Sequence, residues 1–240
     1  MLIKFDSAAV SDAGPREVNE DRVASWTTDG GALVVAIADG LGGMGGGADA
    51  STIAIERLQL TMNAAPATRE QLILAANEAH QEILEAQKTS IRLRQMATTL
   101  TAGVFTEQGL LGVHCGDSRA SIARANGIKR LTVDHSEGER LFRAGKLSRD
   151  ELHDYPRKNI LDSALGSHDK PQIDTFEFPL LPGDKIFFTT DGVHGKLLLR
   201  EMRQMAAENR RAQEFVEQVA VAVRKRSPND NFSIAAVFVY

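Results

Sequence analysis

Residues 33–47 read LVVAIADGLGGMGGG, an apolar run that ends at Asp39 and is followed by six glycines within eight positions. The run predicts a buried strand, and the glycines predict a tight turn into a helix. Residues 40–45 also satisfy G-x-G-x-x-G, the fingerprint of dinucleotide-binding folds. The fold class therefore depends on how the chain continues after this turn.

The sequence after the glycines does not continue as a βαβ unit. A dinucleotide-binding fold needs a second parallel strand that ends in an acidic residue about 20 positions past the glycines. Residues 57–70 read RLQLTMNAAPATRE instead, with a proline and then a new helix cap. A Walker phosphate loop needs G-K-[ST], whereas residues 47–49 are Gly-Ala-Asp. The glycines therefore indicate a tight turn, or a close approach of the backbone to a group other than a nucleotide.

The order of the predicted elements favours an α+β fold. Runs of strands alternate with runs of helices, which is typical of antiparallel sheets. The last strand, 232–240, is apolar on both faces, as expected in the middle of a sandwiched sheet. We predict a single domain over residues 1–240, with two packed, mainly antiparallel sheets between helices in a four-layer αββα sandwich. Strands are expected at 2–10, 22–27, 32–38, 99–105, 110–115, 120–124, 128–132, 173–178, 185–189 and 232–240, and helices at 48–62, from a Thr68-x-x-Gln71 cap, within 136–152, and at 198–205 and 213–224.

Composition narrows the class of protein. An apolar content of 42% with 25% charged residues is ordinary for a globular chain, and the net charge of −4 argues against a general nucleic-acid binder. One cysteine, Cys115, excludes an internal disulfide and fits a reducing compartment. Residues 1–12 carry no apolar stretch of signal-peptide length, and the sequence has no uncharged apolar run of the ~20 residues that span a bilayer. We expect a cytoplasmic protein without nucleic-acid or membrane partners.

Four aspartates share a setting at the ends of predicted strands. Asp39, Asp117 and Asp191 follow apolar runs, and Asp230 precedes the last strand. Any one of them alone would be read as a turn residue. Together they can meet at one edge of a sheet sandwich, where clustered carboxylates repel one another and usually bind divalent cations.

Short motifs occur along the chain in one order. They are R-x-x-N-E-D at 16–21, D-G-x-G-G at 39–43, A-T-T at 97–99, G-D-S-R at 116–119, L-T-x-D-H-S at 131–136, NILDSALG at 159–166, T-D-G at 190–192 and D-N at 230–231. In this order they resemble the metal-dependent Ser/Thr protein phosphatases of type 2C in their compact bacterial form, over essentially the whole chain.

The resemblance implies a set of metal ligands. Asp39 would bridge two cations, with the Gly40 carbonyl on one and Asp191 and Asp230 on the other. Asp117, with Asp191, would hold a third and weaker cation. Oxygen ligands suit Mn²⁺ or Mg²⁺, two per chain, and do not suit Zn²⁺.

The resemblance also implies roles around the metals. Arg16 would be the phosphate clamp, since a guanidinium can form two parallel bonds to phosphoryl oxygens. Glu20 and Asp21 would hold metal-bound waters. Residues 136–155 resemble a mobile flap beside the active site. Leu41 stands where some relatives carry a histidine proposed as general acid, so the acid stays unassigned.

The implied function is hydrolysis of phosphoserine and phosphothreonine in proteins by a metal-bridging water. The protein would be a monomer that opposes a Ser/Thr kinase. Two alternatives stay open: a hydrolase of small phosphate esters on the same site, and an inactive relative that binds phosphoproteins. Cys115 and His135 are interpreted as structural, and Thr190, in place of the usual serine, is expected to touch no proposed ligand.

Overall fold

The computed structural model describes residues 3–42, 46–64, 66–125, 127–167 and 170–240. Leu2 of the first predicted strand and Gly43 of the D-G-x-G-G loop lie outside these ranges. The elements, in chain order, are β1 Phe5–Asp12, β2 Arg22–Thr27, β3 Leu33–Ala38, β4 Gly40–Leu41, α1 Gly46–Ala64, α2 Arg69–Gln87, η1 Ile91–Leu93, β5 Ala97–Thr98, β6 Leu100–Thr106, β7 Gly109–Cys115, β8 Arg119–Arg124, β9 Gly127–Arg130, α3 Glu137–Arg143, α4 Arg149–Asp154, β10 Asp174–Phe178, β11 Lys185–Thr189, α5 Asp191–His194, α6 Leu199–Glu208, α7 Ala212–Lys225 and β12 Phe232–Val239.

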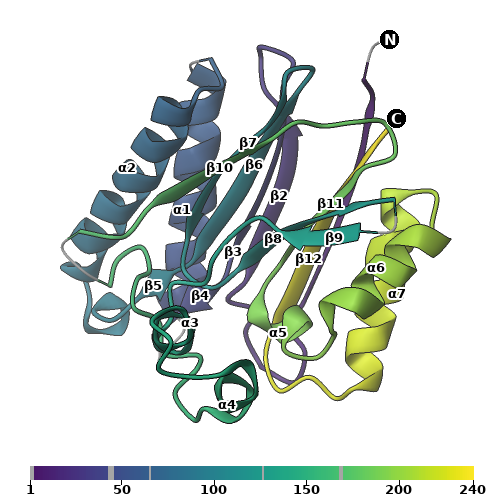
Figure 1. Cartoon of the computed structure of the whole chain (residues 1–240). Helices are drawn as coiled ribbons and strands as arrows, with labels where there is room; N and C mark the ends of the chain where they lie inside the picture. The colour runs from purple at the N-terminus through teal and green to yellow at the C-terminus, as the bar shows by residue number, and fades with distance from the viewer. Residues whose placement is uncertain (1–2, 43–45, 65, 126, 168–169) are drawn as a thin grey trace.

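Two five-stranded sheets form the centre of the molecule. One has the order β1-β12-β11-β8-β9 and the other β10-β7-β6-β3-β2, and every pairing within them is antiparallel. Figure 1 shows α1 and α2 covering one sheet and α6 and α7 covering the other. The predicted α+β class and the αββα layers are confirmed.

The period of two along the strands explains the layers. In β3, Val34, Ala36 and Ala38 face α1 and α2, whereas Val35 and Ile37 face the second sheet. The pattern repeats in β12, whose even-numbered side chains from 232 to 238 pack against α7 while those of 235, 237 and 239 lie between the sheets. β12 is therefore buried along its whole length. This confirms the sandwiched central strand expected from its two apolar faces.

The helices are set by their caps and apolar faces. The Thr68 side chain accepts a hydrogen bond from the Gln71 backbone N–H at 3.3 Å and begins α2. Leu72, Ala75 and Ile83 of α2 are fully buried against the sheet. Ser148 and Glu151 form the expected capping box of α4.

The two ends of the described chain lie side by side. β1 pairs with β12, and beyond this pairing the Lys4 N–H donates to the Tyr240 carbonyl at 3.0 Å while the Tyr240 N–H donates to the Lys4 carbonyl at 2.9 Å. The first and last strands are therefore neighbours within one sheet.

Several predicted boundaries are corrected. The strand expected at 99–105 is shifted by one residue, since β6 spans Leu100–Thr106, and the preceding Ala97–Thr98 forms an unpredicted short strand that pairs with β4. The strand expected at 128–132 ends at Arg130. The short helix α5, Asp191–His194, was not predicted.

Candidate functional site

The sheet topology brings the four aspartates to one end of the sandwich. β3 and β7 both run antiparallel to β6, so Asp39 and Asp117, which follow them, emerge at the same edge. β11 runs antiparallel to β12, which places Asp191 after one strand near Asp230 before the other. In Figure 1 this end carries β4, β5, α3 and α5.

Seven of the eight predicted site residues line one pocket of about 230 Å³ at this end. They are Arg16, Glu20, Asp39, Gly40, Asp117, Asp191 and Asp230. The eighth, Asp21, is buried beside the pocket with a side chain that does not line it. Apart from Asp21, the predicted site residues are therefore assembled as one surface.

Two threonines of the A-T-T motif fix the backbone at Asp39. The Asp39 N–H donates to Thr99 Oγ1 at 2.9 Å, and the Asp39 carbonyl accepts from Thr98 Oγ1 and from the Thr99 N–H, both at 2.9 Å. Gly40 then passes so close to Gly47 and Glu20 that a Cβ there would lie 2.2 Å from the Gly47 carbonyl oxygen. The glycines therefore serve close backbone packing that fixes the carboxylate at the strand end.

The carboxylates in the pocket raise one another's pKa values. Burial raises the pKa of Asp39 well above its usual range, and the charges of Asp21 and Asp191 raise it further. Burial raises the pKa of Asp117 to about 8, with Asp191 adding to the effect. The pKa of Asp191 is raised by burial and by Asp230. The fold therefore places several mutually repelling carboxylates close together, as expected for a site that binds cations.

Hydrogen bonds to Thr190 and Ser233 fix the side chain of Asp21. Thr190 Oγ1 donates to Asp21 Oδ2 at 3.0 Å and accepts from the Ser233 N–H at 2.9 Å. Burial raises the pKa of Asp21 to about 7, although hydrogen bonds from Ser233 and Thr190 oppose the shift. Thr190 therefore bonds directly to a predicted site residue, a contact that the sequence interpretation of this position did not include.

Arg16 lies at the rim of the pocket, bound to the segment before β12. Its Nη2 donates to Asp230 Oδ2 at 3.0 Å and its Nε donates to the Asn229 carbonyl at 3.1 Å. The guanidinium edge is thus oriented by two contacts, and the side chain stays exposed to solvent.

Asn231 holds the loop that carries Arg16 and Glu20. Its Oδ1 accepts from the Glu20 N–H at 2.9 Å, and its Nδ2 donates to the carbonyls of Ala13 at 2.8 Å and Val18 at 3.0 Å. Asn231 belongs to the D-N motif, and its sequence context alone indicated no role for the side chain. Its three bonds show that the amide joins both ends of the chain at the site.

Comparison with known proteins identifies the architecture. The sequence profile described as "Protein phosphatase 2C" matches residues 12–233. The chain belongs to the protein phosphatase 2C family. The pocket is therefore the candidate active site of a protein phosphatase.

Individual relatives agree with this assignment. The serine/threonine phosphatase stp of Listeria monocytogenes is 28% identical over 228 residues, which cover 92% of this chain and 90% of the relative. The solved serine/threonine phosphatase of S. agalactiae shares the fold with a TM-score of 0.93 at 24% identity, covering 99% of this chain and 100% of that one. The catalytic domain of the phosphatase PstP, solved with two manganese ions, has a TM-score of 0.86 at 25% identity, with 99% of each chain covered.

The donor chemistry of this phosphatase pocket suits hard cations. Carboxylate and carbonyl oxygens line it, and none of its lining residues is a histidine or a cysteine. Within the described ranges, no three His, Cys, Asp or Glu side chains are already arranged as a ligand set. Asp230 in particular is paired with Arg16. The residues fit Mn²⁺ or Mg²⁺ by kind and by charge, and binding would require side-chain rotation.

Two further residues of the phosphatase pocket were not predicted. Asn159 and Leu161 line it from the 159–166 segment, whose NILDSALG motif was given no site residue from the sequence. Leu41 also lines it, so the residue at the position of the proposed general acid is apolar. Both Asn159 and Leu161 lie in the NILDSALG motif, but neither is a charged residue of the kind that indicates a place in a metal site.

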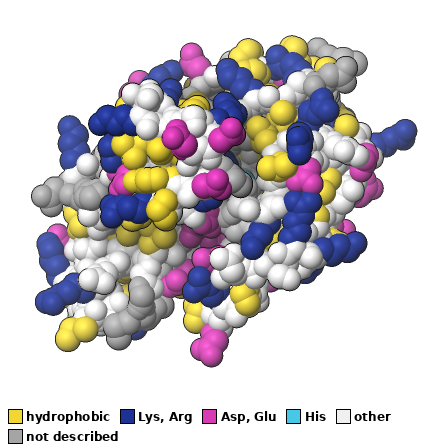
Figure 2. Space-filling view, turned by 60° about the horizontal axis from the view of Figure 1, so that its bottom comes forward, with side chains coloured by type: hydrophobic (Ala, Val, Ile, Leu, Met, Phe, Trp, Pro, Cys, Tyr) yellow, Lys and Arg dark blue, Asp and Glu magenta, His cyan; other side chains and the backbone are white. Residues whose placement is uncertain are grey.

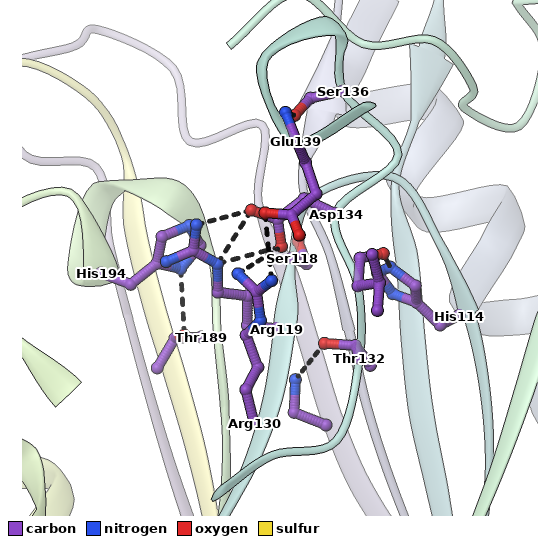
Figure 3. A network of polar contacts seen from close by, with 12 residues as sticks. His114, Ser118, Arg119, Arg130, Thr132, Asp134, Ser136, Glu139, Thr189 and His194 are labelled. Atoms are coloured by element: carbon purple, nitrogen blue, oxygen red, sulfur yellow. Dashed lines mark hydrogen bonds and ion pairs between the residues drawn. The ribbon is translucent and has the colours of Figure 1, made fainter. Parts of the chain in front are cut away.

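Partly buried ion pairs connect the pocket to the 136–155 segment (Figure 3). Arg119 binds Asp134 with both Nε and Nη2, at 3.0 Å and 2.5 Å. Arg130 contacts Asp134 at 3.4 Å and Glu139 of α3 at 3.2 Å. The network joins β8, which begins two residues after Asp117, to the first helix of the predicted flap.

His135 and Cys115 have the structural surroundings expected of them. His135 Nδ1 accepts from the Gly116 N–H at 3.2 Å, and its Nε2 lies 3.1 Å from Asp174 Oδ2. Burial raises the pKa of the Cys115 thiol to about 12, which opposes thiolate formation. Neither residue lines the pocket.

No helix in the described part of the chain is both long and apolar enough to cross a membrane.

Proposed function

We propose that this phosphatase hydrolyses phosphoserine and phosphothreonine in proteins with Mn²⁺ or Mg²⁺ held in the pocket. The observation that carries the proposal is the convergence of Asp39, Gly40, Asp191 and Asp230 with Arg16 around one hollow. Relatives named serine/threonine phosphatase stp and protein phosphatase PhpP support the substrate class. The solved PstP domain with two manganese ions supports the metal.

In this proposal one group of pocket residues binds the cations and another binds the phosphate of the substrate. Asp39, the Gly40 carbonyl, Asp191 and Asp230 would hold two cations, and Asp117 with Asp191 a third. Two bound cations supply a nucleophilic water at neutral pH and neutralise phosphoryl charge. Charge neutralisation in the pocket also removes the repulsion that raises the pKa values of Asp39 and Asp191.

Arg16 would bind the phosphoryl oxygens of the substrate. Its guanidinium carries donors in a fixed fork, of which the bonds to Asp230 and Asn229 use one edge. Glu20, whose Oε1 accepts from the Gly47 N–H at 3.1 Å, and the buried Asp21 would orient water around the cations. The proton donor to the leaving group stays unassigned, because Leu41 has no proton to give.

Membership of the family also motivates proposals on domain organisation, oligomeric state and pathway. We propose that residues 1–240 act as one catalytic domain and a monomer, with residues 136–155 as a flap, in opposition to a Ser/Thr kinase. The single cysteine supports a cytoplasmic location. No observation favours a small-ester hydrolase or an inactive relative over this function.

Chelation tests the proposal. After EDTA and dialysis, turnover of a phosphothreonine peptide should vanish, and Mn²⁺ or Mg²⁺ should restore it. Asp39→Asn and Asp191→Asn should nearly abolish turnover while circular dichroism shows an intact fold. Full activity in chelator, or rescue by Zn²⁺ alone, would sink the metal assignment. Turnover of nucleotides or small esters without turnover of the peptide would favour the small-ester hydrolase.

A further inference from the structure

A second hollow adjoins the phosphatase pocket. It has a volume of about 560 Å³ and shares Asp117, Asn159, Asp191 and Asp230 with the pocket. The 136–155 segment lines one side of it, and the 192–198 turn after Asp191 lines another. Figure 2 shows Asp and Glu side chains gathered around a hollow in this face, with Lys and Arg side chains about its rim. We call this second hollow the side groove.

Part of the charge in the side groove is already neutralised. Asp134 and Glu139 both line it, and they are paired with Arg119 and Arg130 in the network of Figure 3. The remaining carboxylates of the groove are those it shares with the pocket, where cations are proposed to bind. The part of the groove away from the pocket is therefore free of uncompensated negative charge.

Two cations in that part lack a carboxylate partner. Arg149, the first residue of α4, is exposed, and its guanidinium lies 5.7 Å from the Phe142 ring centroid. Lys196 Nζ donates to the Ser227 carbonyl at 3.2 Å. No ion pair to either side chain occurs in the described ranges. These two cations come from different walls of one groove, so both contribute a positive potential that favours an anionic group entering it.

Resting on the proposed function, we propose that the side groove receives substrate residues next to the phosphorylated one, and that Arg149 and Lys196 bind an anionic side chain there. An extended chain advances about 3.3–3.6 Å per residue, so residues a few positions from the phosphorylated one reach an adjoining groove. The anion is a carboxylate or a second phosphate. Charge complementarity of this kind contributes specificity more than raw affinity.

The test compares matched phosphothreonine peptides whose flanking positions carry Ala, Glu, Lys or phosphoserine. The ratio of kcat/KM for each charged peptide to that for the Ala peptide measures the preference. We expect Glu to raise the ratio about two- to fivefold and Lys to lower it, the range for partly exposed ion pairs. Phosphoserine against Glu distinguishes a second phosphate from a carboxylate as the favoured anion.

Variants assign the preference to the groove. Arg149→Gln and Lys196→Gln should each bring the ratio for the Glu peptide toward one. Arg143→Gln is the matched control, because Arg143 is an exposed residue of α3 outside the groove and its replacement should leave the ratio unchanged. Fluorescence anisotropy with non-hydrolysable phosphonate peptides should give the same order of Kd values, and 0.5 M salt should weaken it.

The possible outcomes distinguish failure of the side-groove proposal from failure of the proposed phosphatase function. Turnover of the Ala peptide with equal ratios for all flanks, or a preference that survives both substitutions, would overturn the groove assignment and leave the phosphatase activity standing. Absence of turnover on every phosphopeptide in Mn²⁺ would overturn the proposed function itself.

Discussion

Arg16 and Asp230 form a 3.0 Å ion pair across the rim of the pocket. The two side chains were assigned different tasks, phosphate binding for Arg16 and metal binding for Asp230. Both stay substantially exposed, at 55% and 45% of their side-chain surface, so the pair is readily rearranged. The position of the proposed phosphate clamp is therefore coupled to that of a proposed metal ligand, and a change at either residue should affect both proposed tasks.

Arg16→Ala should raise KM for a phosphopeptide about tenfold or more and lower kcat less. A hydrogen bond to a charged group contributes about 1.5–3 kcal/mol, and the loss falls on substrate binding when the metal ligands remain. Steady-state kinetics in saturating Mn²⁺ measure both constants. Arg57→Ala is the control, since Arg57 pairs with Glu82 between α1 and α2. An unchanged KM would show that Arg16 does not bind the phosphate.

Asp117→Ala should retain the two proposed tightly bound metals and lose activity about 10- to 100-fold, the range for residues that support a metal site. The loss should be larger on a phosphoprotein than on a small ester, because Asp117 lines both the pocket and the side groove. Calorimetric metal titration and kinetics on both substrates measure this. A lower Tm with normal metal stoichiometry and near-normal kcat would instead make Asp117 a turn residue.

Thr190→Val should destabilise the protein by about 1–3 kcal/mol, because the Ser233 N–H and the Asp21 carboxylate each lose a buried partner. Thr190→Ser keeps the hydroxyl and should stay close to the parent chain. Urea unfolding gives the stabilities. Turnover should fall in the valine variant alone, and equal stability and turnover in both variants would mean that the Thr190–Asp21 bond has no role.

The buried His114 should make the free energy of unfolding fall as the pH is lowered. The ring is fully buried, with Thr101 Oγ1 at 2.9 Å from Nδ1 and the Val133 carbonyl at 2.9 Å from Nε2, and burial lowers its pKa to about 4. Between about pH 4 and pH 6.5 the unfolded chain binds more protons at this residue than the folded chain. The free energy of unfolding therefore falls as pH drops through this window, by up to about 3 kcal/mol.

His114→Gln isolates this contribution. Urea unfolding in EDTA at pH 7.5 and pH 5 should show that the stability difference between parent and variant shrinks at the lower pH. A difference that is the same at both pH values would show that His114 does not titrate on unfolding. The variant also removes the ring that lies 4.7 Å from that of His135, which lowers stability equally at both pH values.

The long elements could be predicted because each carries its own periodicity. β2 and β11 have the predicted bounds, and α2 begins at the predicted Thr68 cap and buries Leu72, Ala75, Ala79 and Ile83, which recur at helical spacing. α5 and β4 could not be predicted in this way, since four and two residues are too few to show a period. Both form where the chain turns into the site, and their conformation follows from tertiary contacts.

The candidate site residues divide in the same way, into those that the local sequence indicates and those that only the folded chain brings together. The aspartates stand in short motifs at the ends of apolar runs, so their convergence at one edge could be anticipated. The Arg16–Asp230 pair joins residues 214 positions apart, and nothing local in either segment indicates the other. Asn159 likewise reaches the pocket through a long connection, and although it begins the NILDSALG motif it carries no charge that would indicate a place in the site. Such contacts are products of the topology and become visible only with it.

The hydrogen bonds between Lys4 and Tyr240 bear on how the molecule could be rebuilt. A short linker between these residues would turn the β1–β12 pairing, which now closes the longest loop in the fold, into a local hairpin. New ends could open at the exposed turn between β6 and β7. Such a circular permutant should keep every aspartate at its strand end, and because folding rate depends on the sequence separation of contacts, it should fold at a different speed to the same catalytic surface.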